Sequence, residues 1–199
     1  DNDKEIFEEL FFDANDKPNF EGKYHLHVKR GKHTNFKKKN GSLLNIFNKL
    51  KNVRKKRSLP GIDKKILLSW NCLYIKGLIK LYKITKDQQI FIKIKRAIEF
   101  ILNNMVDNDI VYSVYHDEKC FPGYLDDYAF LSSCLLDYLT LEWNDEFYKY
   151  TKKICDKIIN DFEDKDNGGY FFTSKDHQEM FYRPKSTNDD SLPAGIVYA

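Results

Sequence analysis

Asp63-Lys64-Lys65-Ile66-Leu67-Leu68-Ser69-Trp70-Asn71-Cys72 is the stretch on which the fold turns. A basic, turn-rich approach ends here and a long run of helix-forming sequence begins. Trp70 and Asn71 are an unusual pair at the head of a helix that is otherwise leucine, isoleucine and tyrosine. An indole N–H and a side-chain amide are costly to bury without partners. The head of this helix is therefore the first place to look for a functional site.

Two similar units follow this stretch, related by a shift of 57 residues that aligns Trp70 with Asp127 and Asn71 with Tyr128. Each unit reads as a helix, a turn, a second helix and a short β-rich excursion. We predict first helices over 66–84 and 128–141, second helices over 88–105 and 145–162, and β excursions over 110–115 and 170–173.

The two helices of each unit differ in their apolar pattern. The first helix is apolar on several faces, which is typical of a buried helix, whereas the second carries one apolar stripe, which is typical of a peripheral helix. Inner and outer helices alternate in this way in an (α/α) toroid. We therefore predict a mainly α fold, a partial (α/α) toroid with short β-hairpins. A third unit begins at Pro193-Ala194-Gly195, so we expect the chain to be part of a longer protein.

The region before the repeats has a different composition. Residues 1–62 are predicted to form a basic N-terminal segment with a short strand over 24–28 and a helix capped by Ser42, and residues 63–199 to form the helical hairpins. No stretch of the 199 residues approaches the ~18 consecutive apolar residues of a membrane span. The first residues are acidic, unlike the basic head of a signal peptide. We expect a soluble, cytoplasmic protein without a membrane partner.

Charge is unevenly distributed along the chain. Between Lys23 and Lys65 there are fifteen Lys or Arg against one acid, which gives +14 locally and −11 elsewhere. Clustered cations are what a phosphate backbone requires, so nucleic-acid binding is one hypothesis. No aromatic-interleaved binding motif accompanies the lysines, and a solvated helix face explains most of them. We therefore expect no nucleic-acid partner.

Neither the cysteines nor the histidines form a recognisable ligand motif. The four cysteines contain no C-x-x-C pair and lie in apolar or helical surroundings, which favours reduced structural thiols. His25 and His27 share one face of the expected strand, and a metal site with His33 is conceivable on spacing alone. A divalent cation would be repelled by the surrounding lysines, so no metal and no cofactor is expected.

Three polar clusters are expected to meet where the inner helices begin. Helix starts expose unpaired N–H groups and favour anionic or hydroxyl-rich ligands. Sugar chemistry would require paired carboxyl groups, an aromatic platform and a side chain that holds hydroxyls. The candidate catalytic residues are Asp127, Asp189 and Arg183. The candidate substrate-binding residues are Trp70, Asn71, Asp126, Tyr128 and Asp63.

The same residues also have structural interpretations. Asp126 or Asp127 could be a helix N-cap, Arg183 an ion-pair partner for such an aspartate, and Trp70 a filler of the core. None of the five histidines lies in the three clusters, so an epimerase base would have to come from elsewhere.

The motifs resemble those of the spermatogenesis-associated protein 20 family. The stretch 63–72 resembles its signature D-K-x-L-x-x-W-N-G, and Cys72 stands in place of the glycine. An E-D-Y-A-F-like segment is matched by 125–130. An R-P-K-x-x-x-D-x-x-x-P-S-G-N segment is matched within 183–196, where Ala194 and Ile196 replace the serine and the asparagine.

The resemblance implies a thioredoxin-like domain followed by an (α/α) toroid similar to those of N-acylglucosamine 2-epimerases and six-hairpin glycosidases. It implies a carbohydrate ligand, and as partners the thioredoxin-like domain and the missing toroid helices of a full-length chain. Two functions stay open. The chain is part of a carbohydrate-binding or carbohydrate-active protein, or it is a catalytically inactive structural or interaction module of a thioredoxin-domain-containing protein.

Overall fold

The computed structural model describes residues 2–11, 17–18, 21–22, 26–31, 40–177, 182–186, 188–189 and 192–199. The chain divides into two compact units, Asp1–Ile62 and Asp63–Ala199. The described residues include no helix that is both long enough and apolar enough to cross a membrane.

The described residues of the first unit form the helices α1 (Asn2–Phe11) and α3 (Asn40–Arg54), which pack on each other. Its core is a small apolar cluster of Ile6, Leu10, Phe11, Leu43 and Ile46. Because α3 begins at Asn40, Ser42 lies inside the helix and is not the N-cap that the sequence predicted. The strand expected over 24–28 is not formed by its described part, 26–28; Tyr24 and His25 lie outside the described residues.

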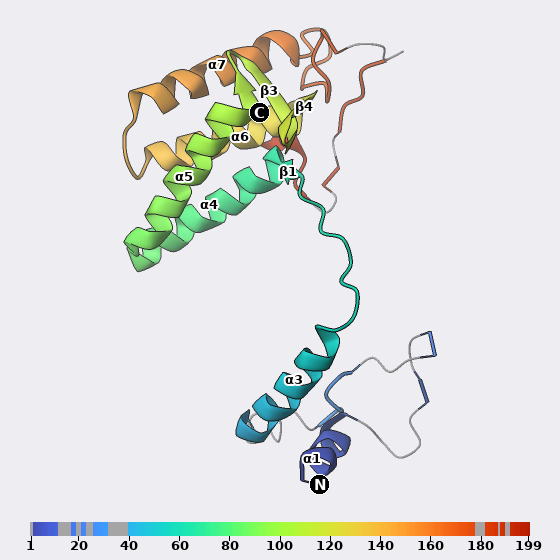
Figure 1. Cartoon of the computed structure of the whole chain (residues 1–199). Coiled ribbons are helices and arrows are strands. Elements are labelled where there is room, and N and C mark those ends of the chain that lie inside the picture. The colour runs from blue at the N-terminus through green and yellow to red at the C-terminus, as the bar shows by residue number, and fades with distance from the viewer. Residues whose placement is uncertain are drawn as a thin grey trace. The chain divides into compact units, whose positions relative to one another are not determined.

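The second unit contains four long helices and a small sheet (Figure 1). The helices are α4 (Leu68–Thr85), α5 (Gln88–Met105), α6 (Leu125–Leu139) and α7 (Asp145–Asp161). The strands are β1 (Ile66–Leu67), β2 (Val106–Asp107), β3 (Ile110–His116) and β4 (Glu118–Pro122), and the short 3-10 helix η1 (Gly195–Val197) follows. The helices form two neighbouring hairpins, α4 with α5 and α6 with α7.

The repeat predicted from the sequence is present in the helix boundaries. The first helices begin at Leu68 and Leu125 and the second at Gln88 and Asp145, in both cases 57 positions apart. The second helices are capped by polar side chains. Asp87 accepts a hydrogen bond from the backbone N–H of Gln89 at 2.8 Å, and Asn144 caps α7 in the same way. Such caps satisfy N–H groups that have no partner within the helix.

Burial follows the predicted contrast between inner and outer helices for one hairpin. Ten of the fifteen residues of α6 are buried, whereas α5 and α7 bury a single stripe each. The mainly helical fold with short β elements is therefore confirmed. The other inner helix differs from α6, because α4 buries only Leu68, Cys72, Ile75 and Ile79.

The sheet holds the heads of the two inner helices together. β3 pairs antiparallel with β1, β2 and β4, and Val114 lies opposite Leu67 on one side and Cys120 on the other. β1 leads directly into α4, and β4 leads into α6 through Gly123. The second β excursion, predicted over 170–173, is reduced in the described residues to one bridge between Glu163 and Tyr170.

Two adjacent leucines of α6 test the burial of the inner helix. Leu135 is fully buried and Leu136 is 50% exposed. We expect Leu135→Ala to lower the free energy of unfolding by about 2–5 kcal/mol, because it leaves a cavity in the core. Leu136→Ala should change it by no more than about 0.5 kcal/mol. Urea denaturation followed by circular dichroism measures both, and equal effects would contradict the assignment of α6 as the buried inner helix.

Candidate functional site

One buried carboxylate joins the heads of both inner helices to the sheet. The Asp127 side chain, in a residue only 4% exposed, accepts hydrogen bonds from the Ser113 hydroxyl of β3 and from the backbone N–H of Tyr124 at 3.1 Å. It also hydrogen-bonds to Ser69 at the start of α4. Burial raises the pKa of Asp127, while these donors act to lower it. The carboxylate therefore closes the start of α6 and ties three elements together.

The neighbouring carboxylate, Asp126, makes the equivalent link to η1. It accepts a hydrogen bond from the backbone N–H of Gly195 at 2.8 Å, and burial raises its pKa. A Cβ atom at position 195 would lie 2.3 Å from the Asp126 carboxylate oxygen and 2.8 Å from its Cα. Only glycine fits this approach. The starts of α4, α6 and η1 are thus brought together.

Arg183 lies in a different environment from the one expected. Its Nε donates to the Thr173 carbonyl at 3.0 Å, and its Nη2 donates to the Asp161 carbonyl at 2.6 Å. The guanidinium also lies 4.2 Å from the centre of the Phe171 ring. Burial lowers the pKa of Arg183. The arginine therefore fastens the loop after α7 through backbone carbonyls, and does not pair with Asp126 or Asp127.

The remaining candidates make local contacts. Asp189 is exposed and accepts from the Ala194 N–H at 2.9 Å, and Asp63 pairs with the adjacent Lys65 at 3.3 Å. Asn71 donates to the Leu67 carbonyl at 2.8 Å, which satisfies part of its amide inside the first turn of α4. Trp70 is 58% exposed, so its interpretation as core filling is wrong.

A hollow lined by both aromatic and polar side chains lies beside the β3–β4 hairpin, and we call it the hairpin cavity. Its volume is about 510 Å³. Of the sequence candidates only Tyr128 reaches it, and the Tyr128 hydroxyl is fixed by accepting a hydrogen bond from the Val111 N–H at 3.1 Å. The wall is formed by Ile110, Tyr112, Pro122, Gly123, Tyr128, Lys157, Ser174, Asp176 and His177.

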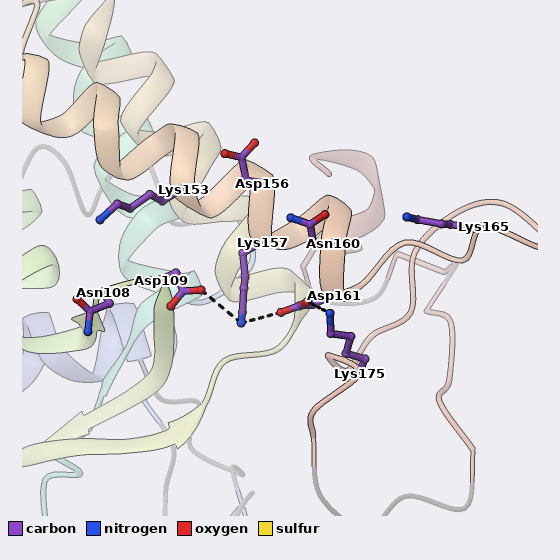
Figure 2. A pocket seen from close by; sticks show the side chains of 9 residues that line it. All are labelled: Asn108, Asp109, Lys153, Asp156, Lys157, Asn160, Asp161, Lys165 and Lys175. Atoms are coloured by element: carbon purple, nitrogen blue, oxygen red, sulfur yellow. Dashed lines mark ion pairs between the residues drawn. The ribbon is translucent and has the colours of Figure 1, made fainter.

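A second hollow, the charged cleft, adjoins the hairpin cavity at Lys157 and has a volume of about 730 Å³. Figure 2 shows the Lys157 ammonium between two carboxylates, 2.6 Å from Asp161 and 3.5 Å from Asp109. Lys175 contacts Asp161 at 2.8 Å from the other side. Burial acts to raise the pKa of Asp161, but these two lysines outweigh it and hold the pKa below its ordinary value. Asp109 and Asp161 are thus already paired with lysines of this cleft.

A turn after α7 positions the loop that contributes to both hollows. The Asp164 carboxylate accepts from the backbone N–H groups of Asp166 and Asn167 at 3.1 Å and contacts the Lys185 ammonium. The Lys185 ammonium and these N–H groups lower the pKa of Asp164 to about 2. Gly168 and Gly169 follow with positive φ, so the chain reverses here. This fixes the approach to Ser174 and Asp176.

Metal ligation has no support among the described residues. They contain no group of three or more His, Cys, Asp or Glu side chains that could hold an ion, and His25 and His33 lie outside them. All four cysteines are free thiols, as predicted, and Cys72 and Cys134 contact each other between α4 and α6.

Sequence comparison supports one of the predicted resemblances. No family model matches the chain. The chain is 32% identical over 161 residues to an uncharacterized protein of Caenorhabditis elegans, a match that covers 74% of this chain and 21% of that protein. It is 26% identical over 142 residues to human spermatogenesis-associated protein 20, covering 65% of this chain and 18% of the human protein. The resemblance to the spermatogenesis-associated protein 20 family is therefore confirmed, and the chain spans about a fifth of the length of these relatives.

Two solved structures from Bacteroides thetaiotaomicron are similar to the chain. A glycoside hydrolase family 76 mannosidase matches with a TM-score of 0.47 and 12% identity, covering 54% of this chain and 29% of that one. A GH76 α-mannanase matches with a TM-score of 0.48 and 14% identity, covering 83% of this chain and 38% of that one.

Two glycines test the link between α6 and η1. We expect Gly195→Ala to lower the free energy of unfolding by about 1–3 kcal/mol, because its Cβ would overlap Asp126. Gly77→Ala is the matched control, since a Cβ at that position in α4 meets nothing within 4 Å. It should raise the free energy of unfolding by about 0.5–1 kcal/mol through helix propensity. Urea denaturation gives both values, and effects of the same sign would refute the close approach.

The pH dependence of stability tests the burial of Asp127. Its pKa in the folded chain lies above the ordinary value of 3.8, so the folded state binds this proton more tightly than the unfolded chain does. That contribution is present below pH 3.8 and is lost as the pH rises through the folded pKa. We therefore expect the free energy of unfolding, relative to the Asp127→Asn variant, to fall over this window.

Ser113→Ala provides the companion measurement. It removes one donor to the carboxylate, so it should raise the pKa of Asp127 further and extend the decline to higher pH. Urea denaturation at successive pH values measures both effects. If the free energy of unfolding of the wild-type chain instead rises with pH relative to that of Asp127→Asn, the carboxylate is better solvated than described.

Proposed function

We propose that the unit 63–199 binds a hydroxyl-rich, carbohydrate-like ligand in the hairpin cavity. The observation that carries this proposal is the composition of the wall, in which aromatic side chains stand beside Ser174, Asp176 and Lys157. Sugar rings present an apolar face and a rim of hydroxyl groups. A site for them therefore combines an aromatic surface with a few oriented polar groups.

The size and preorganisation of the cavity support this choice. Ligand pockets for small molecules span roughly 300–1,000 Å³, and a volume of about 510 Å³ suits one or two sugar rings. Tyr112 is partly buried, with the Lys119 ammonium 5.1 Å from its ring centre, and Tyr128 is held by its bond to Val111. His177 packs against the Tyr124 ring at 5.3 Å. These contacts fix the wall before a ligand arrives.

Binding is favoured over catalysis by the roles of the carboxylates. Glycoside hydrolysis uses two carboxyl groups on opposite sides of one bond, about 5–9.5 Å apart. Among the described residues, Asp176 is the one carboxyl group in the wall of the hairpin cavity, and Asp161 in the adjoining cleft is paired with two lysines. Asp127 and Asp189 line neither hollow. A paired-carboxylate mechanism therefore has no support in the described geometry.

The competing proposal is an inactive structural or interaction module. The bonds of Asp126, Asp127 and Arg183 favour it, because all three side chains hold elements of the fold together. In that case the partners are the thioredoxin-like domain and further hairpins of a longer cytoplasmic polypeptide, as the family resemblance implies. The two proposals differ in one respect, which is saturable binding of a small sugar.

Calorimetric titration with a panel of monosaccharides separates the two proposals. We expect saturable binding to at least one sugar, and Asp176→Asn should weaken it by about ten-fold through the loss of a charged acceptor. Tyr112→Ala should weaken it similarly by removing the aromatic surface. Asp117→Asn is the control, since the Asp117 side chain is 99% exposed on the hairpin turn and outside the cavity.

Two outcomes would contradict carbohydrate binding in this cavity. One is the absence of saturable heat with any sugar of the panel, which would favour the structural module. The other is binding that Asp176→Asn and Tyr112→Ala leave unchanged, which would place the ligand elsewhere. Release of sugar from an aryl glycoside by the purified chain would contradict the absence of catalysis, provided that the Asp176→Asn variant abolishes it.

A further inference from the structure

The inner helix α4 presents an apolar stripe to solvent. Trp70 is 58% exposed, Tyr74 67%, Leu81 43% and Ile84 82%, and Gly77 is exposed between them. The steps along the chain are four, three, four and three residues, the spacing that keeps side chains on one face of a helix. Four large apolar groups aligned on one face over about four turns differ from the scattered single exposures that are ordinary on protein surfaces.

The internal repeat identifies the equivalent helix face in the second hairpin and allows the burial of the two faces to be compared. A shift of 57 residues takes the stripe onto Asp127, Leu131, Cys134 and Tyr138 of α6, with Leu141 just beyond its end. The first four of these are at most 4% exposed. The same helix face is therefore buried in one unit and open in the other.

The face of α6 is covered by α4. Ser69 of α4 hydrogen-bonds to Asp127, and Cys72 contacts Cys134. At the middle of the interface the Lys76 ammonium forms an ion pair with Asp137 at 2.9 Å, and it is largely shielded from solvent. The packing of α4 on α6 thus combines an apolar stripe with one ion pair at the edge of that stripe.

We propose that the exposed face of α4 docks an amphipathic α-helix, packed on α4 as α4 packs on α6. The repeat also gives the charge of that helix. Lys80 of α4 is equivalent to Asp137 of α6, so the sign of the border charge is reversed at this interface. The docking helix carries an acidic residue where α4 carries Lys76. Lys76, Lys80 and Lys83 are the charged residues of α4, which has no acid of its own.

Gly77 adds a geometric condition to this proposal. It is equivalent to Cys134, which meets Cys72 at the α4–α6 interface, and it offers no side chain at the centre of the stripe. A Cβ placed there would meet nothing within 4 Å, so the centre of the face is open. The docking helix can approach α4 at least as closely as α4 approaches α6. The proposal is independent of sugar binding, because none of the stripe residues lines the hairpin cavity.

A peptide derived from α4 itself is the probe. It has the sequence of residues 66–86 with Lys76→Glu, stapled on the side that faces away from the interface, and the control peptide keeps Lys76. The protein carries Trp143→Phe, so that Trp70 is the remaining one of its two tryptophans. A tryptophan-free peptide (Trp70→Phe) then allows the fluorescence of Trp70 to report on docking.

We expect the emission of Trp70 to shift to shorter wavelength and to saturate with one peptide per chain. The control peptide should bind about ten-fold more weakly, because it places an ammonium against Lys80. Lys80→Glu in the protein should reverse this preference, so that the peptide with Lys76 binds more tightly. Lys93→Glu, a surface charge on α5, should leave the preference unchanged.

Three results would overturn the proposal. They are the absence of a saturable shift in the Trp70 emission, equal binding of the two peptides, and a preference that Lys80→Glu does not reverse. Sedimentation of the protein alone provides a further check. Self-association that Leu81→Glu abolishes would identify a second copy of this chain, and not an acid-bearing helix, as the occupant of the face.

Discussion

The buried carboxylate of Asp127 is the interaction on which the second unit depends. It accepts hydrogen bonds from the backbone N–H of Tyr124 at the start of α6 and from the Ser113 hydroxyl of β3, and it hydrogen-bonds to Ser69 at the start of α4. An ionised carboxylate is costly to bury, and this cost is offset only where several donors converge on it. The two inner helices and the sheet must therefore take up their positions together, and Asp126 extends the same junction to η1.

This arrangement separates the parts of the unit that hold it together from the parts that can meet a ligand. The helix heads, where unpaired N–H groups would otherwise attract an anion, are occupied by side chains of the chain itself. The β3–β4 hairpin and the loop after α7 are different, because their side chains surround a hollow of about 510 Å³. Arg183 and Asp164 hold that loop in place through hydrogen bonds with backbone groups.

Much of the fold could be predicted from the sequence, because a helix face and a helix cap are local patterns. The second helix of the first hairpin begins and ends where its stripe predicts, and the 57-residue repeat recurs in the helix starts. The junction was predictable in part, since Asp126 and Asp127 stand at a helix start. The hairpin cavity was not, because its wall combines residues of four separate segments that are ordinary in their local context. The interpretation of Trp70 as core filling was wrong, because no described element of its unit covers its face of α4.

Chemical-shift mapping by NMR tests most directly whether the ligand site lies in the hairpin cavity and the helix heads are structural. A sugar titrated into the isotopically labelled chain should perturb the amide signals of Ile110, Tyr112, Gly123 and Ser174. The signals of Ser69, Asp127 and Gly195 should stay in place, because the side-chain bonds of the junction do not open. Perturbations confined to Trp70, Asn71 and Gly195 would contradict this account and return the site to the heads of the inner helices.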